Sequence, residues 1–193
     1  SEYIEGSTLA QNQIEKANQP EAACRLVLQL CEPLQALHEA GIIHRDLKPS
    51  NILIDRSGVG RLTDFGLAKS LIGQTTNTLT GQVLGTPAYM APEIVAGNSK
   101  HADPRTDIYS IGVMFYELLS TSVPFQGSWS ELESAILHDQ PPKLESFAPP
   151  WDIPRELEQV CLKCLEKNPK DRYQSVDLLV ADLKRFLDGL PVH

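Results

Sequence analysis

The spacing of apolar residues between positions 20 and 40 predicts a long helix. Apolar residues recur there at intervals of three and four, as one face of a helix requires. Pro20 suits the first turn, Gly41 suits the position after the last turn, and Pro33 is expected to kink the helix between them. We therefore place a helix from Pro20 to Ala40.

The pattern after this helix predicts one small hairpin, one long loop and several further helices. Two short apolar runs, Ile52–Ile54 and Val59–Thr63, are joined by "DRSGVG", which is typical of a hairpin. Residues 66–92 show no clear period and are rich in Thr and Gly, so we expect a functional or mobile loop. Helical patterns follow in "TDIYSIGVMFYELLS", which is apolar nearly all round, in "SWSELESAILHD" with its capping-box spacing Ser128-x-x-Glu131, from Pro154 to Lys167 and from Ser175 to Leu187.

Composition narrows the classes of partner. The 193 residues are 41% hydrophobic, enough for one or two ordinary cores, and the formal net charge is −8. An acidic chain is a poor general binder of nucleic acid, which needs a basic face, so we expect no nucleic-acid partner. No apolar stretch is long enough to span a membrane, so we expect no membrane contact by this segment, although a longer parent could be tethered to one.

The four cysteines favour buried thiols over a metal or redox site. Cys161 and Cys164 form a CxxC, but no second CxxC and no nearby His pair completes a zinc site. They share an apolar helical stripe with Leu157, Val160 and Leu165, and buried thiols fit a reducing, cytoplasmic setting.

The stretch "GIIHRDLKPSNILID", residues 41–55, carries the chemistry. It sets a His, an Arg, an Asp, a Lys and an Asn among apolar residues. A buried strand cannot hold that much charge without partners. Either the segment is a solvated turn, or its polar groups converge on one reaction.

Four strings in order carry a family resemblance: "HRDLKPSN", "TDFG", "GTPAYMAPE" and "TDIYSIGVMFYELL". Together they resemble the catalytic half of a serine/threonine protein kinase. The resemblance implies a mainly α fold, the large lobe of a kinase, with a small β-hairpin carrying the metal-binding loop and without the small β-rich lobe. It covers residues 1–193 and divides them into a hinge at 1–6, a catalytic loop at 44–51, an activation segment at 64–93 and a helical subdomain at 94–193.

The resemblance implies transfer of the γ-phosphoryl group of ATP, with Mg²⁺, to Ser or Thr of a protein substrate. Asp46 would accept or orient the proton of the substrate hydroxyl, and Lys48 would neutralise charge on the migrating group. Asn51 and Asp64 would hold Mg²⁺ through hard oxygen ligands. Lys48 and Thr86 are similar to serine/threonine rather than tyrosine kinases.

Other positions take nucleotide-binding or structural roles by the same resemblance. "SEYIEG" is similar to the kinase hinge, so Glu2 and Ile4 would supply backbone contacts to adenine, and Leu53 would lie beneath its ring. Three structural roles follow from the same resemblance. His44 and Phe65 would form a packing pair, and Glu93 and Arg172 a buried ion pair. Asp107 would be the acid that holds the catalytic loop, or simply a carboxylate at a helix N-terminus.

The activation segment offers regulatory sites. Arg45 is the kind of cation that holds a phosphorylated loop. The candidate phosphosites are Thr75, Thr76, Thr78 and Thr80. The alternative is that "GQTTNTLTG" is only a polar, flexible loop.

The front of the kinase pattern is missing. We find no G-x-G-x-x-G loop and no V-A-I-K lysine, so we expect the isolated piece to be inactive and its parent active. The face that meets the small lobe is expected to bind that lobe or to self-associate. Two alternatives stay open: a pseudokinase or scaffold used only for binding, and a metal-dependent hydrolase using His44, Asp46, Asn51 and Asp64, against which Lys48 argues.

Overall fold

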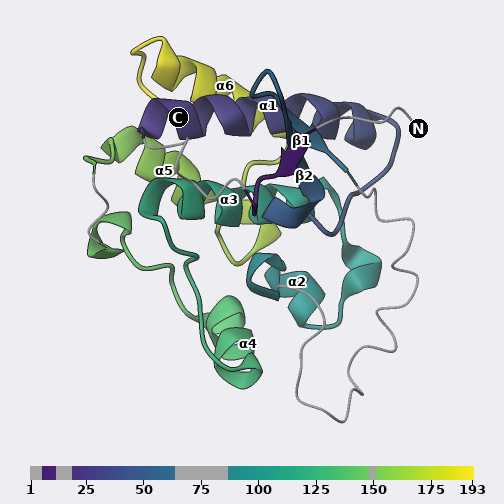
Figure 1. Ribbon diagram of the computed structural model, residues 1–193. Helices are drawn as coiled ribbons and strands as arrows, with labels where there is room; N and C mark the ends of the chain where they lie inside the picture. Colours follow the sequence, from purple (N-terminus) through teal and green to yellow (C-terminus); the bar gives the residue numbers. More distant parts are fainter. Residues whose placement is uncertain (1–5, 12–18, 64–86, 148–150) are drawn as a thin grey trace.

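The computed structural model describes residues 6–11, 19–63, 87–147 and 151–193 (Figure 1). The helices are α1 (Pro20–Glu39), α2 (Pro92–Val95), α3 (Pro104–Ser120), α4 (Trp129–His138), α5 (Arg155–Cys164) and α6 (Val176–Leu187). The strands are β1 (Gly6–Thr8), β2 (Ile52–Asp55) and β3 (Gly60–Leu62). Short 3₁₀ turns lie at Pro49–Asn51, Pro87–Tyr89, Ser99–His101, Leu144–Phe147 and Pro169–Asp171. The expected mainly helical fold with a small hairpin is confirmed.

Helix α3 runs through the core. Every residue from Thr106 to Ser120 is buried except Glu117, as its nearly continuous apolar pattern predicts. Figure 1 shows α6 running along α1 at the top of the view, α3 and α5 below them, and α4 and α2 at the opposite end of the molecule. The helix pairs α1 with α6, α1 with α3 and α3 with α5 are all in contact.

Gly112 sets the closest approach of α3 to α5. A Cβ at this position would lie 2.5 Å from Cβ of Cys164 and 3.2 Å from Cδ2 of Leu165. Because real Cβ atoms do not approach that closely, only glycine allows the two helices to pack at this spacing.

The ends of α1 lie within one residue of the sequence prediction. The helix begins at Pro20 and continues through Pro33 to Glu39. Gly41, with φ of +73°, then closes the helix: its N–H donates to the carbonyl of His38, and the N–H of Ile42 donates to that of Leu37. This Schellman arrangement turns the chain back towards residues 43–45.

The fifth helix is shorter than predicted. We expected a helix from Pro154 to Lys167, but α5 ends at Cys164. Pro169 disfavours helical backbone at the residue before it. The carbonyls of Glu166 and Lys167 instead accept hydrogen bonds from the guanidinium of Arg172.

The sheet is antiparallel with the order β1-β2-β3. The predicted hairpin is present, with Ile52 opposite Leu62. The pattern did not predict β1, which pairs with the other edge of β2 and continues through a hydrogen bond from the N–H of Leu9 to the carbonyl of Ile52 (2.7 Å). The N-terminal strand is thereby fixed to the end of the catalytic loop.

The thiols are buried, as the sequence predicts. Cys24, Cys31, Cys161 and Cys164 are free and 0% exposed. No group of three or more His, Cys, Asp or Glu residues in the described part of the chain could hold a metal ion. Among the same residues, no helix combines the length and apolarity needed to cross a membrane.

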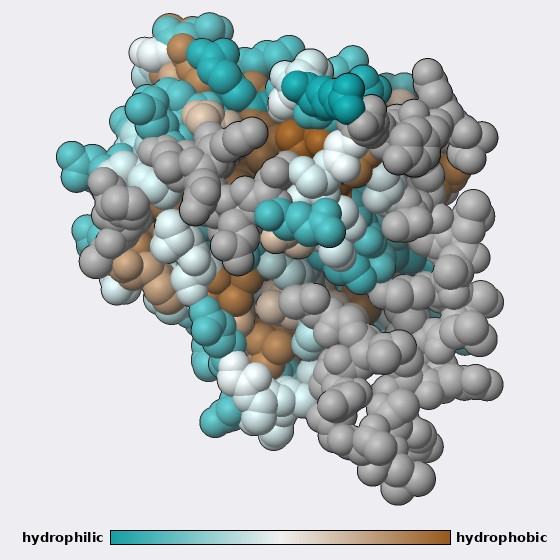
Figure 2. Space-filling model, in the orientation of Figure 1, coloured by the Kyte–Doolittle hydropathy of each residue, from teal (hydrophilic) through white to brown (hydrophobic). Residues whose placement is uncertain are grey.

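The described surface is mostly polar or neutral on the face drawn in Figure 2, with apolar side chains showing near α1 and between α3 and α4. Large exposed apolar residues are Ile42, Trp129, Leu178 and Leu190. Self-association through the lobe interface stays a prediction.

Candidate active site

Two polar side chains of the predicted catalytic loop converge on the carboxylate of a third residue, Asp46. The Nζ of Lys48 lies 3.1 Å from Oδ2 of Asp46 and 3.3 Å from its Oδ1. The Nδ2 of Asn51 lies 3.1 Å from the same Oδ2 and 2.8 Å from the backbone carbonyl of Asp46. The turn Pro49–Asn51 brings this about, because it folds the chain back so that Asn51 faces the residue five positions earlier.

The hairpin returns the chain to the same place. After β2 and β3, the N–H of Thr63 donates to the carbonyl of Asn51 (2.9 Å). The ring Nε2 of His44 is 3.2 Å from the carbonyl of Thr63. Two metal ligands are predicted, Asn51 and Asp64. Thr63 directly precedes Asp64 in the sequence, and its hydrogen bond places it beside Asn51.

Asp107 fixes the backbone at the start of the loop. Its Oδ2 accepts from the N–H of His44 (2.9 Å), and its Oδ1 accepts from the N–H of Arg45 (2.8 Å). Arg45 has φ of +64°, a left-handed conformation that is unfavourable for a residue with a side chain. A carboxylate that is 0% exposed therefore holds a strained backbone directly before Asp46.

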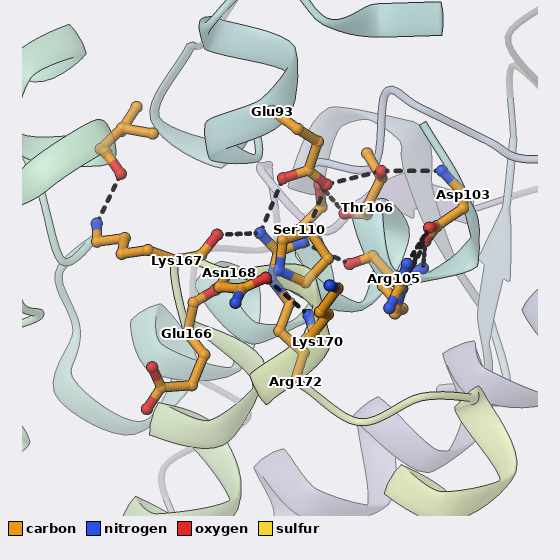
Figure 3. Close-up of polar contacts among 12 residues, drawn as sticks. Glu93, Asp103, Arg105, Thr106, Ser110, Glu166, Lys167, Asn168, Lys170 and Arg172 are labelled. Carbon is orange, nitrogen blue, oxygen red and sulfur yellow. Dashed lines mark hydrogen bonds and ion pairs between the residues drawn. The ribbon is translucent and has the colours of Figure 1, made fainter. Parts of the chain in front are cut away.

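A second buried cluster surrounds Glu93, the last residue of the predicted activation segment (Figure 3). Glu93 in α2 and Arg172 form the expected ion pair through two contacts, 2.8 Å from Nη2 to Oε2 and 3.0 Å from Nη1 to Oε1. The other donors of the guanidinium go to the carbonyls of Arg105, Glu166 and Lys167. Burial alone would raise the pKa of Glu93, but the hydrogen bonds and charge of Arg172 outweigh it and hold that pKa below its ordinary value.

The match to known sequences decides the family. Residues 1–182 match the family model of the protein kinase domain. The chain belongs to the protein kinase domain family.

Individual relatives agree with that assignment. The chain is 38% identical over 190 residues, 96% of its length, to a protein of Clostridium perfringens named as a "probable serine/threonine-protein kinase". It is 37% identical over 191 residues, 98% of its length, to the serine/threonine-protein kinase PknB of Mycobacterium leprae. It spans only 27% and 30% of these two relatives. The resemblance to serine/threonine kinases drawn from the motifs is confirmed.

Several predicted positions of the kinase pattern fall outside the described residues. They are Glu2, Ile4, Asp64, Phe65, Thr75, Thr76, Thr78, Thr80 and Thr86. Leu53 is described: it is half-buried in β2, between its partners Thr8 in β1 and Arg61 in β3.

Sequence reasoning missed two contacts near the candidate site. His38, in the last turn of α1, contacts Asp107. The hydroxyl of Tyr89 donates to Oε2 of Glu117 (2.7 Å), where burial raises the pKa of the carboxyl. No local pattern points to either contact, because the partners are 69 and 28 residues apart in the chain.

Lys167 is a further missed contact. Its Nζ donates to the carbonyls of Ala135 (3.0 Å) and Ile136 (2.7 Å) near the end of α4 and lies 4.2 Å from the centre of the Phe125 ring. Burial lowers the pKa of this amine to about 8. Lys167 thus accepts from Arg172 through its backbone carbonyl and holds α4 through its side chain.

Proposed function

We propose that the protein containing this chain transfers the γ-phosphoryl group of ATP to Ser and Thr hydroxyls of protein substrates. The observation that carries the proposal is the convergence of Lys48 and Asn51 on the carboxylate of Asp46. A base, a cation and an amide gathered at one point suit phosphoryl transfer, in which positioning and charge neutralisation do most of the work.

Asp46 orients the attacking hydroxyl. Its carboxylate is half-buried and accepts hydrogen bonds from both neighbours, which fix its direction. In the transfer step the substrate Ser or Thr hydroxyl gives its proton to this carboxylate, its oxygen bonds to the γ-phosphorus, and the bond from that phosphorus to the bridging oxygen breaks, so that the electron pair leaves with ADP. The Nζ of Lys48 lies beside the same carboxylate and neutralises charge on the migrating group.

The polar atoms of Asn51 fit a magnesium ligand. Its Nδ2 is committed to Asp46, which leaves the hard oxygen Oδ1, 3.5 Å from the hydroxyl of Ser50, as the ligand atom. Asn51 and Asp64 would hold Mg²⁺, which when bound neutralises phosphate charge. The chain itself keeps Asn51 in place, because the N–H of this residue donates to the carbonyl of Lys48 and its carbonyl accepts from Thr63.

The proposal is tested with the full-length protein, radiolabelled ATP, Mg²⁺ and a mixture of generic protein substrates. We expect label on phosphoserine and phosphothreonine, and a loss of at least about 100-fold in kcat for Asp46→Asn. The matched control is Asp171→Asn, because Asp171 is an exposed Asp in the turn Pro169–Asp171. Binding of ATP without transfer would favour a scaffold, and release of free phosphate with no labelled protein would favour a hydrolase.

A further inference from the structure

Lys167 connects α4 to the buried cluster of Arg172 through two different groups. Its Nζ donates to the carbonyls of Ala135 and Ile136 in the last turn of α4, and its backbone carbonyl accepts from Nη2 of Arg172 (3.0 Å). In Figure 3 the side chain of Lys167 points away from Arg172, whereas its carbonyl faces the guanidinium. A single residue therefore joins α4 to the ion pair of Glu93.

An ammonium suits this position because a helix end lacks backbone donors. The last four carbonyls of a helix have no partner within it, and the helix dipole favours a positive charge beside them. Ile136 carries one of these carbonyls in α4. The ring of Phe125, which is buried just before α4, lies 4.2 Å from Nζ and adds a cation–π contact. The charged residues that act on the ammonium are Asp139, Arg172 and Glu166.

Helix α4 packs against the end of the predicted activation segment. Its neighbours are α2, which contains Glu93, and the turn Pro87–Tyr89. Figure 1 shows α4 and α2 at the end of the molecule opposite α1 and α6. The same turn is held from α3, because the hydroxyl of Ser110 donates to the carbonyl of Tyr89 (2.8 Å). A shift of α4 would therefore remove one of the two supports of this turn.

The place of the turn in the sequence relates it to the substrate. Thr86 directly precedes Pro87, and it is one of the two positions by which the resemblance assigns serine and threonine as the acceptors. The residues predicted to hold the nucleotide and Mg²⁺, such as Leu53 and Asn51, lie on β2 and the turn before it. A displaced turn should thus affect the acceptor hydroxyl more than ATP.

We propose that Lys167 is a positioning residue for the protein substrate: by fixing α4 to the chain around Arg172, it holds the turn Pro87–Tyr89 where the substrate hydroxyl is received. This inference rests on the proposed function. Loss of the ammonium leaves the last turn of α4 without its donor and frees α4 to move with the turn that packs on it.

The experiment compares Lys167→Met and Lys163→Met in the full-length protein. Methionine keeps apolar volume over the ring of Phe125 but cannot donate to α4. Lys163 is a matched control, because its Nζ also lies over an aromatic ring, 4.3 Å from the centre of Tyr173, but belongs to α5 and donates to the carbonyl of His193. For Lys167→Met we expect kcat/KM for the protein substrate to fall about 10-fold, mostly through KM, with KM for ATP within about 2-fold of wild type. Lys163→Met should match wild type.

Restoring the ammonium gives a second variant. Lys167→Cys, alkylated with bromoethylamine, regains an ammonium at nearly the length of lysine, whereas the four native thiols of this chain are free but buried. Alkylation should restore most of kcat/KM in Lys167→Cys and leave wild type unchanged. An alkylated variant as impaired as the untreated one would contradict the proposal. If Lys167→Met does not fold, Lys167→Cys before and after alkylation takes its place.

A further readout does not depend on activity. The N–H of Met90 donates to the carbonyl of Pro87 (2.9 Å), so its hydrogen exchange reports on the turn. Exchange at Met90 should accelerate at least about fivefold in Lys167→Met and stay near the wild-type rate in Lys163→Met. In an active protein, unchanged exchange, unchanged kinetics or equal rises in KM for ATP and for protein would each overturn the proposal. Faster exchange at Met90, when the wild type transfers no phosphate, would support the link from Lys167 to the turn and refute the proposed function.

Discussion

Thr106 and Asp107 are consecutive residues in the first turn of α3, and their side chains hold two different segments of the site. The hydroxyl of Thr106 donates to Oε1 of Glu93 (2.8 Å), whereas Asp107 accepts from the backbone of the catalytic loop. The turn itself is fixed at Asp103, whose carboxylate accepts from the N–H of Arg105 (2.9 Å). One buried helical turn therefore sets the position of the Glu93 segment relative to Asp46.

The ion pair of Glu93 and Arg172 should contribute strongly to stability. In Glu93→Gln the buried guanidinium loses its countercharge, and buried pairs broken in this way cost about 3–5 kcal/mol. We expect about 3 kcal/mol by denaturant unfolding, the lower end of that range, because backbone carbonyls still accept from Arg172. The control is Lys143→Met, which breaks a surface pair whose side chains are 76% and 79% exposed and should change stability by less than about 0.5 kcal/mol. Equal effects of the two variants would contradict the prediction.

The same pair predicts a dependence on pH. The pKa of Glu93 lies below its ordinary value of 4.5 in the folded protein, so the unfolded chain takes up the proton first as the pH falls. The stabilisation by Glu93 is therefore complete above about pH 5 to 6 and is lost as the pH falls through the folded pKa. Unfolding free energies of wild type and Glu93→Gln, measured from pH 6 to pH 3, should converge towards low pH. A gap that stays constant would show that the carboxylate of Glu93 is not the titrating group.

Gly112→Ala tests the packing of α3 on α5. Alanine favours a helix over glycine by about 1 kcal/mol, but the added Cβ would lie 2.5 Å from Cβ of Cys164. The cost of overpacking should exceed the gain in helix propensity, and we expect the free energy of unfolding to fall by about 2 kcal/mol. In the double variant with Cys164→Gly, the clash is removed, so the two changes should be less than additive. Strict additivity would mean that positions 112 and 164 do not interact, and would contradict the prediction.

The four thiols should be inert in the folded protein. Burial raises the pKa of both Cys24 and Cys31 to about 12, and all four side chains are 0% exposed. Because the thiolate is the reactive form, a disulfide reagent at pH 8 should label the cysteines only after denaturant is added. Rapid labelling of the CxxC in the native protein would favour the redox interpretation.

The sequence predicted what local patterns encode. The helix at residues 20–40, the hairpin after the catalytic loop and the buried α3 all follow from apolar spacing and from Pro or Gly at their ends. The order of the motifs gave the family. Strand β1 was not predicted. Its three residues, Gly-Ser-Thr, are too few to show alternation, and β2, with which it pairs, is far away in the sequence.

The supporting contacts could not be predicted, because they depend on how distant elements meet. His38 and Asp107 are separated by 69 residues, and Lys167 lies 31 residues from its acceptor at Ile136. Nothing in the neighbourhood of His38 marks it apart from any other histidine near a helix end. The end of α5 was misplaced for a related reason: the residues just after the helix are held by Arg172, which donates to the carbonyls of Glu166 and Lys167 from further along the chain.

The ion pair of Glu93 with Arg172 has a consequence for the synthesis of the chain. The two residues are 79 positions apart, and Arg172 lies ten positions before the end of the family match at residue 182. While a ribosome is still adding the residues between them, the carboxylate has no countercharge to bind. Until Arg172 has been added, Glu93 can be held only by earlier contacts such as that with Thr106, so products that stop before position 172 should hold Glu93 less firmly.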